Sequence, residues 1–311
     1  MKSNESIVWI IISLFASSPT FAASSTVEYG IGFGMRQDDL RWNIAGQLDG
    51  TNPNILSELT WTDVNSIQLN GFMELYLKYN LVLFADAAIG TIVNGSVQDS
   101  DYFADDRTEE FSRSTAATDD GTTGDINIAF GYRFGPGNRR THNGLGFIPL
   151  VGYTSNEQKL EITDGVQEIN TITGETGPFN GLESSYNTKW TGVWYGMRLQ
   201  YEHSKRWKIF AEYQYHDATY EATGTWNLRA DLAQPISFSH EADGLGDVFV
   251  ISWRFTPSRG YMLEIIGKYQ QWETKPGIDR TYGAGGDTLD TRLNEVVWES
   301  KEALIRSVWF F

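Results

Sequence analysis

The chain has 311 residues, with 24 Lys and Arg against 40 Asp and Glu, no cysteine and 14% aromatic residues. A net charge of −16 without a basic stripe repels a phosphate backbone, so we expect no nucleic-acid partner. The lack of cysteine excludes disulfides, thiolate metal sites and cysteine nucleophiles, and we predict no metal and no cofactor. The length suits one large β-barrel as well as two soluble domains.

The first 23 residues have the pattern of a secretory signal peptide. Lys2 precedes an apolar run from Ile7 to Phe15, and small residues follow up to Ala22 and Ala23. The run is too short for a membrane-spanning helix, which needs about 20 residues. We therefore expect export through the inner membrane with cleavage at Ala22 or Ala23, leaving residues 24–311 as the mature domain.

Apolar and polar residues alternate along most of the mature chain. From 66 to 79, apolar residues such as Ile67 and Leu69 oppose polar residues such as Gln68 and Asn70. The same alternation recurs in three further segments, 125–134, 206–217 and 261–272. Alternation with a period of two predicts strands that have one apolar and one polar face.

The connections between these segments alternate in length. Short turns near residues 79, 140, 205 and 258 alternate with five long polar segments, at 47–53, 97–124, 162–187, 222–242 and 275–292. Short turns at one end and long loops at the other are typical of outer-membrane barrels. We therefore predict an all-β fold, a transmembrane antiparallel up-and-down barrel of about ten strands, monomeric, in the bacterial outer membrane. The terminal Phe311 resembles the signal that such barrels present to their assembly machinery.

Charged residues fall on the expected inner face of the barrel. They are Glu74, Arg198, Glu202, Glu212, Glu264 and Lys268. Ten strands enclose little free space, so we expect these side chains to form ion pairs that fill the lumen.

Two of the long segments carry most of the negative charge. Residues 97–124 hold eight acids against Arg107 and Arg113, and 162–187 hold four acids and no base, which together makes ten of the sixteen excess negative charges. An anionic outer mouth attracts cationic peptides. Solvation of exposed loops, with divalent cations bridging to lipopolysaccharide phosphates, is the alternative explanation.

The strand order and one motif resemble the omptins, ten-stranded outer-membrane endopeptidases with a catalytic cleft at the outer rim. The motif is Gly-Ser-Val-Gln-Asp-Ser-Asp-Tyr-Phe-Ala-Asp at 95–105, which is similar to the omptin segment that carries paired aspartates. The resemblance implies that Asp99 and Asp101 occupy the places of these catalytic aspartates.

The second half of the omptin mechanism, an Asp-His couple after the seventh strand, has no aligned counterpart. The matching positions are Thr225 and Asn227, and neither side chain can act as a base. We predict that His216 lies in a lumen hydrogen-bond network. His240, beside Glu241, is the candidate for a displaced base.

Further omptin features have partial matches. We assign Asp38, Asp39, Asp105 and Asp106 to a substrate-binding surface. Tyr153 matches one member of the omptin lipopolysaccharide site, where lipopolysaccharide acts as the activating lipid, but Glu157 stands where an Arg is expected.

Three interpretations follow. The first is an omptin-like barrel without the standard protease activity that acts as a surface binding or structural protein, with outer-membrane lipids, lipopolysaccharide and cationic peptides as partners. The second is an omptin-type endopeptidase that cleaves basic peptides with Asp99, Asp101 and a displaced His240. The third is a narrow porin or adhesin, a class that includes the porin-like outer-membrane proteins of Chlamydia-related bacteria.

Overall fold

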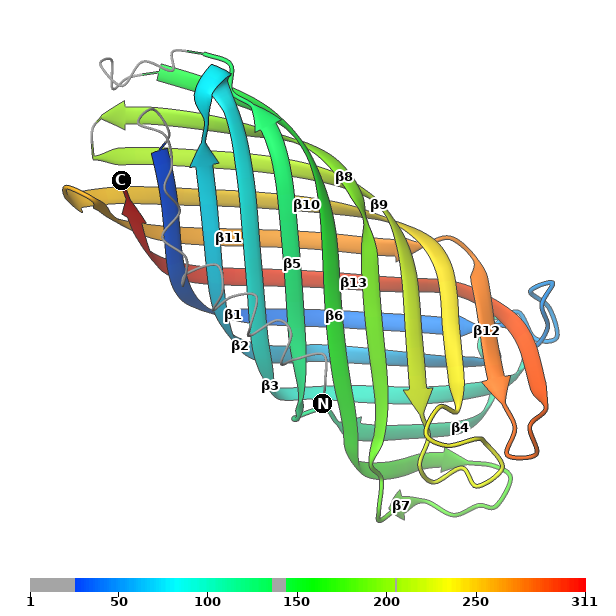
Figure 1. The fold of residues 1–311 in the computed structure, drawn as a ribbon. Coiled ribbons are helices and arrows are strands. Elements are labelled where there is room, and N and C mark those ends of the chain that lie inside the picture. The colour runs from blue at the N-terminus through cyan, green and yellow to red at the C-terminus, as the bar shows by residue number, and fades with distance from the viewer. Residues whose placement is uncertain (1–25, 136–143, 205) are drawn as a thin grey trace.

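The computed structural model describes residues 26–135, 144–204 and 206–311, so the expected signal peptide lies outside the described residues. Thirteen antiparallel strands form one sheet, and β1 pairs with both β2 and β13, which closes the sheet into a ring (Figure 1). The strands are β1 (Thr26–Ile44), β2 (Ser57–Tyr76), β3 (Leu81–Ala104), β4 (Thr108–Ala117), β5 (Gly121–Tyr132), β6 (Gly144–Asn170), β7 (Gly177–Pro178), β8 (Ser184–Ser204), β9 (Trp207–Thr225), β10 (Phe238–Ser258), β11 (Tyr261–Thr274), β12 (Gly277–Tyr282) and β13 (Thr288–Phe310). A short 3-10 helix, η1 (Lys78–Asn80), joins β2 to β3.

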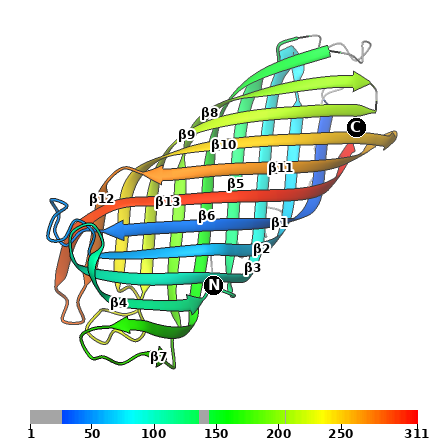
Figure 2. The ribbon, with the colours of Figure 1, turned by 180° about the vertical axis from the view of Figure 1, so that it is seen from behind.

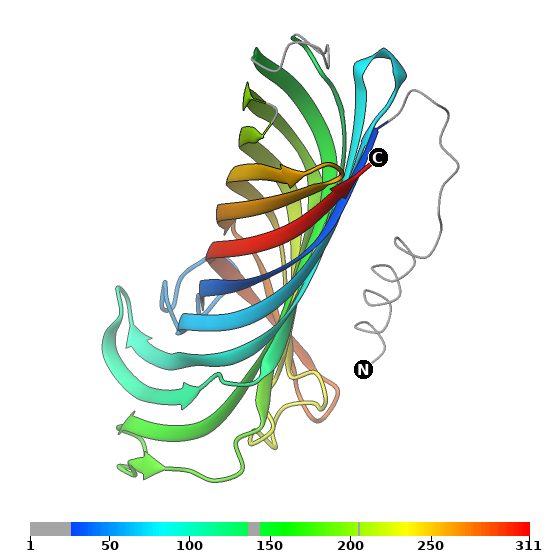
Figure 3. The ribbon, with the colours of Figure 1, turned by 90° about the vertical axis from the view of Figure 1, so that its left-hand side faces the viewer.

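The ring has ten positions, as the sequence predicted. β4 and β5 both pair with β3 and β6, and β11 and β12 both pair with β10 and β13, so each of these two pairs fills one position. β7 is a two-residue segment that pairs only with the outer part of β6. The short turns, the start of β1 and the end of β13 all lie at one end of the barrel, which we call the turn end (Figure 2). The opposite end, with the β3–β4 hairpin, β7 and β12, is the loop end (Figure 3).

An exposed apolar belt surrounds the half of the barrel nearer the turn end. It includes Phe33, Met35, Ile67, Ile128, Phe130, Leu145, Val151, Val193, Tyr195, Tyr215, Phe249, Ile251, Ile265 and Ile305. A belt of this kind on a closed barrel is the surface that contacts the hydrocarbon of a membrane. Within the described ranges, no helix has the length and hydrophobicity to cross a bilayer. The strands continue past the belt, so their loop-end portions stand outside the membrane.

The long polar segments contain more strand than the sequence indicated. Residues 97–124 were expected to form a loop, but β3 runs on to Ala104, β4 covers Thr108–Ala117 and β5 begins at Gly121. Likewise β6 continues to Asn170, inside the second expected loop. Beyond the membrane both faces of a strand can meet water, so the apolar face that identifies a strand in the sequence is missing there. Asp99 and Asp101 are therefore held by a rigid sheet.

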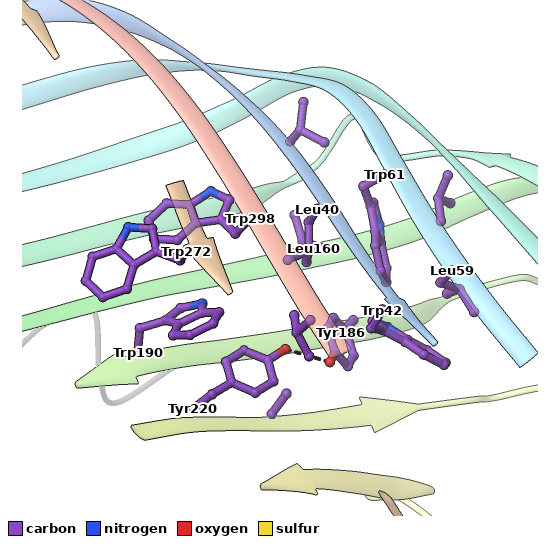
Figure 4. Close-up of a cluster of buried hydrophobic side chains, with 14 of the residues drawn as sticks. Leu40, Trp42, Leu59, Trp61, Leu160, Tyr186, Trp190, Tyr220, Trp272 and Trp298 are labelled. Carbon is purple, nitrogen blue, oxygen red and sulfur yellow. Dashed lines mark hydrogen bonds between the residues drawn. The ribbon is translucent and has the colours of Figure 1, made fainter. Parts of the chain in front are cut away.

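The interior on the loop-end side is filled by aromatic side chains. Trp42, Trp61, Tyr186, Trp190, Tyr220, Trp272 and Trp298 are at most 4% exposed and form one cluster with Leu40, Leu59 and Leu160, which we call the aromatic layer (Figure 4). Tyr186 stacks on Trp61 at 5.2 Å between ring centroids, and Trp272 stacks on Trp298 at 5.7 Å. Because large buried rings contribute most to hydrophobic stabilisation, this layer is a true core inside the lumen.

Nearer the turn end, ion pairs fill the lumen, as the sequence predicted. Arg254 contacts Glu28 at 2.7 Å, Glu264 at 2.8 Å and Glu74 at 3.1 Å. Arg198 contacts Glu74 at 2.7 Å and also pairs with Glu212. Buried charges stay ionised only when they are paired in this way, so the network fixes the lumen side chains in place.

Candidate functional site

Asp99 and Asp101 lie on the same face of β3, beyond the apolar belt at the loop end. They alternate with Ser100 and share their face with Val97, which belongs to the aromatic layer's cluster, so both carboxylates face inward. β2 and β4 flank β3 here: Asp99 is opposite Leu59 and Ser114, and Asp101 is opposite Ser57 and Ser112. The strand pairing thus places two carboxylates next to each other at the inner rim of the mouth.

The environment of the pair favours the protonated state. Burial and the neighbouring Asp101 raise the pKa of Asp99 well above its usual range, and the charge of Arg229 offsets this only in part. Burial also raises the pKa of Asp101, while hydrogen bonds from the Ser57 and Ser112 hydroxyls and the charge of Arg229 lower it. In addition, Asp99 Oδ1 is enclosed and has no hydrogen-bond partner among the described residues. The pair therefore lacks a full complement of positive charge.

Arg229 is the cation that the chain supplies to this site. It lies in the segment between β9 and β10, and its guanidinium forms a two-pronged ion pair with Asp231, at 2.8 and 2.7 Å. Its side chain stays 56% exposed. Sequence reasoning missed Arg229, although it is the sole Lys or Arg in the expected loop 222–242, which was a usable signal.

Asp105 and Asp106 have a structural role at the tip of the β3–β4 hairpin. Asp105 accepts a hydrogen bond from the Asn54 backbone at 2.8 Å, and Asp106 exchanges two hydrogen bonds with Asn54, at 2.9 and 2.8 Å. Arg107 binds Glu58 at 2.8 Å. These contacts fasten the hairpin to the β1–β2 connection, so these carboxylates hold the chain that carries Asp99.

Asp38 and Asp39 are separated by the pleat of β1. Asp38 is 1% exposed and accepts hydrogen bonds from Arg36 and Gln158, both at 2.8 Å, inside the barrel. Asp39 is on the opposite face and accepts a hydrogen bond from the Asp63 backbone at 2.9 Å. Consecutive residues of a strand point to opposite faces, so these two do not form one surface. The four predicted substrate-binding acids are thus spread over three places.

His240 lies inside the aromatic layer, where its Nδ1 is hydrogen-bonded and its Nε2 lies close to a carboxylate without forming a hydrogen bond among the described residues. Its Nε2 is 3.1 Å from Asp279 Oδ1, and its Nδ1 is 2.7 Å from the Tyr186 hydroxyl. Tyr186 in turn bonds the Tyr220 hydroxyl at 2.7 Å. His240 is 0% exposed, with Trp42 packed edge-on at 4.9 Å. The structure therefore places beside His240 a carboxylate that the sequence did not identify, at a buried position and without a hydrogen bond to the ring.

The positions that align with the omptin Asp-His couple fasten loops together. Thr225 donates a hydrogen bond to the Pro235 carbonyl. Asn227 donates to the Gly181 carbonyl at 2.6 Å and accepts from the Glu183 backbone at 3.0 Å. His216, as predicted, is a lumen residue, 1% exposed and 3.0 Å from Gln214.

Tyr153 lies on the outer wall of β6 and is 53% exposed. Glu157 is further along the same strand and pairs with Lys189 of β8 at 3.0 Å. The outer wall near Tyr153 thus carries a neutralised pair in place of the basic residue that the omptin pattern requires.

The barrel geometry agrees with that of a solved outer-membrane protease. The outer membrane protease OmpT from Escherichia coli has a TM-score of 0.75 with 12% identity, over 95% of this chain and 100% of that chain. A Pseudomonas aeruginosa FadL homologue matches with a TM-score of 0.30 and 10% identity over 93% and 91% of the two chains. The translocator domain of the autotransporter NalP from Neisseria meningitidis matches with a TM-score of 0.35 and 9% identity, over 98% of this chain and 95% of that chain. Among curated protein sequences, none matches the chain.

OmpT shows that the fold is omptin-like, as the motif at 95–105 and the strand order predicted. The sequence family is given by the family model described as Protochlamydia outer membrane protein, which matches residues 30–307, nearly the whole barrel. The chain is therefore an outer-membrane β-barrel of omptin-like fold that belongs to the Protochlamydia outer membrane protein family.

Proposed function

We propose that this protein is a surface-exposed binding barrel that holds cationic peptide segments at its acidic mouth and does not cleave them. The observation that carries the proposal is the inward-facing pair Asp99 and Asp101, whose Asp99 Oδ1 is enclosed without a hydrogen-bond partner among the described residues. A guanidinium or ammonium group would donate hydrogen bonds to this pair and supply its missing positive charge. The surplus of acids in segments 97–124 and 162–187 would attract such a ligand from a distance.

Arg229 supports the choice of ligand. Its positive charge acts on both carboxylates, and its guanidinium is tied to Asp231 on the rim of the mouth. The chain thus brings a guanidinium of its own toward the pair. An arginine side chain of a peptide would have the same chemistry and would compete with Arg229.

The positions of the histidines argue against hydrolysis. Of the three described histidines, His216 and His240 are at most 1% exposed, and His203 lies near the turn end of β8. A general base has to approach the attacking water within hydrogen-bond distance. Within the described part of the chain, no histidine is therefore exposed to the water that surrounds Asp99 and Asp101.

The test is binding of a fluorescent hexa-arginine peptide to the refolded barrel in detergent micelles, followed by fluorescence anisotropy. We expect the double variant Asp99→Asn with Asp101→Asn to weaken binding at least about tenfold, since one charged hydrogen-bonded pair contributes about 1.5–3 kcal/mol. Arg229→Gln should strengthen binding, because it removes the internal competitor.

The matched control is Asp164→Asn with Glu175→Gln, which removes the same charge from exposed positions of β6 and the loop after it. If the pair is a defined site, this control should change affinity much less than the Asp99 and Asp101 variant. Equal losses in both variants would show that only the general negative field attracts the peptide. Undiminished binding by the Asp99 and Asp101 variant would disprove the site.

Endopeptidase activity is the second candidate, and one observation favours it. His240 Nε2 lies 3.1 Å from Asp279 Oδ1, which brings together the two residue types of an Asp-His couple for general-base catalysis. For this couple to act, the segment between β9 and β10 would have to uncover it. Hydrolysis of basic peptides distinguishes the two candidates.

A further inference from the structure

A cavity of about 120 Å³ lies in the lumen between the aromatic layer and the ion pairs near the turn end. Trp194, Trp272 and His216 line it on the loop-end side, and Arg198 and Arg254 line it on the other. The volume has room for several water molecules, since one requires roughly 10–15 Å³ by this measure. It is separate from the acidic mouth, and the proposed peptide binding does not involve it.

The charges around the cavity do not balance. Six carboxylates line it, Glu74, Asp86, Asp125, Glu212, Glu264 and Glu302, against four bases, Arg198, Arg254, Lys268 and Arg306. The imbalance persists in the wider lumen, where the ion pairs join nine acids to seven bases. His216 also lines the cavity and is left out of this count because a neutral imidazole has no charge. Among the described residues, the lumen therefore holds two more negative than positive charges, in a medium where unpaired charges are costly.

Individual atoms show where the missing charge belongs. Asp125 is 6% exposed; its Oδ2 binds Arg36 at 2.9 Å, but its Oδ1 has no hydrogen-bond partner among the described residues. Glu264 is 1% exposed; its Oε1 binds Arg254 at 2.8 Å, and its Oε2 lacks a hydrogen bond, with Arg306 Nη1 at 3.6 Å. Both residues line the cavity, so two side chains that each carry an unpartnered carboxylate oxygen stand in its wall.

We propose that this lumen cavity binds a hydrated monovalent cation, such as sodium or potassium, beside Asp125. Carboxylate oxygens and water are the ligands that hard cations prefer. The described residues contain no group of three or more His, Cys, Asp or Glu side chains that could hold a metal ion, so water has to supply most of the ligands of this cation. Water in the cavity completes the coordination, and the cation supplies part of the missing charge.

The direct test is an anomalous diffraction measurement on crystals of the barrel refolded and grown in rubidium chloride, since rubidium replaces potassium. We expect an anomalous peak in the cavity beside Asp125. The solution counterpart is the thermal unfolding midpoint in sodium, potassium or N-methylglucamine chloride at equal ionic strength. The midpoint should rise and saturate with the two alkali ions, and the bulky organic cation should have no such effect.

Asp125→Asn removes the unpartnered charge and keeps the side-chain shape, so it should abolish both the peak and the alkali-ion response. Asp290→Asn is the control, because Asp290 is paired with Arg280 near the loop end, away from the cavity. A cavity without anomalous signal in the wild-type barrel would overturn the proposal, whether or not the Asp125 variant folds. A midpoint that follows pH but not the choice of cation would show that bound protons neutralise the carboxylates instead.

Discussion

At the residue scale, the burial of Asp99 works against the stability of the folded barrel, as a side chain placed for the proposed binding can do. Its pKa is raised because burial and Asp101 disfavour the ionised form in the folded barrel. The folded state therefore binds a proton more tightly than the unfolded chain does. By linkage, this group lowers stability progressively as the pH rises above its unfolded pKa of about 4.

Asp99→Asn should therefore raise the thermal unfolding midpoint at pH 8, and the gain should be smaller at pH 5, where wild-type Asp99 is closer to its protonated form. A buried polar group without its hydrogen-bond partners costs about 1–3 kcal/mol, so the gain at pH 8 should be of that order. Circular dichroism melts at the two pH values measure it.

Asp290→Asn should have the opposite effect, because the Arg280 ion pair lowers the pKa of Asp290. Its carboxylate adds stability above the unfolded pKa, and its removal should lower the midpoint slightly at both pH values. A lower midpoint for Asp99→Asn at pH 8 would contradict the assignment of a destabilising carboxylate.

His240 is a buried polar residue with one hydrogen-bonded nitrogen, Nδ1 to the Tyr186 hydroxyl, and one nitrogen, Nε2, that lies close to Asp279 without a hydrogen bond among the described residues. Replacing it with Ala would leave the buried Asp279 and the Tyr186 hydroxyl short of a partner and open a void among aromatic rings. We expect a loss of roughly 2–4 kcal/mol in the free energy of unfolding, against about 1 kcal/mol for Tyr220→Phe. Urea titration of the folded barrel in detergent measures both free energies of unfolding. Equal small losses for the two variants would contradict the structural importance of His240 in the aromatic layer.

At the element scale, the β3–β4 hairpin determines where the acidic pair sits. Asn54 forms three hydrogen bonds to Asp105 and Asp106, and these fasten the hairpin tip to the β1–β2 connection. Asn54→Ala should increase proteolytic cleavage at the hairpin tip without changing the heat-modifiable electrophoretic migration of the barrel. Unchanged protease resistance would show that strand pairing with β6 alone holds the hairpin.

The positions of strands could be predicted from the sequence where one face of the strand contacts lipid. Alternation at 66–79 and 206–217 predicted β2 and β9, because lipid and lumen impose different polarity on the two faces. Alternation fails at 97–117, where polar residues stand on both faces of β3 and β4, and the strand there depends on backbone pairing. The contact of His240 with Asp279 requires the register of β10 on β12, which joins residues 39 positions apart and leaves no local signal.

At the scale of the whole molecule, the lumen is filled at two levels. The aromatic layer fills the loop-end side, and Arg198, Arg254 and their carboxylate partners fill the side nearer the turn end. The charged lumen was predictable from residue types and alternation. The aromatic layer was not, because Trp and Tyr are equally expected in the girdles outside a barrel.

A filled lumen predicts the absence of a steady open-channel current when the purified barrel is inserted into a planar lipid bilayer. The control is a known general porin inserted under the same conditions. Reproducible single-channel steps from the wild-type barrel would favour the porin interpretation and contradict a lumen closed at both levels.

The measurement that tests the central claim most directly combines binding and hydrolysis in one sample. A fluorogenic peptide with a dibasic sequence is incubated with the refolded barrel and lipopolysaccharide, beside the Asp99→Asn and His240→Gln variants, after heat-modifiable migration has verified folding. Our account predicts salt-sensitive binding of an intact peptide, weakened by Asp99→Asn and unaffected by His240→Gln. Cleavage by the wild type that is lost in both variants would contradict it and establish a peptidase with a relocated base.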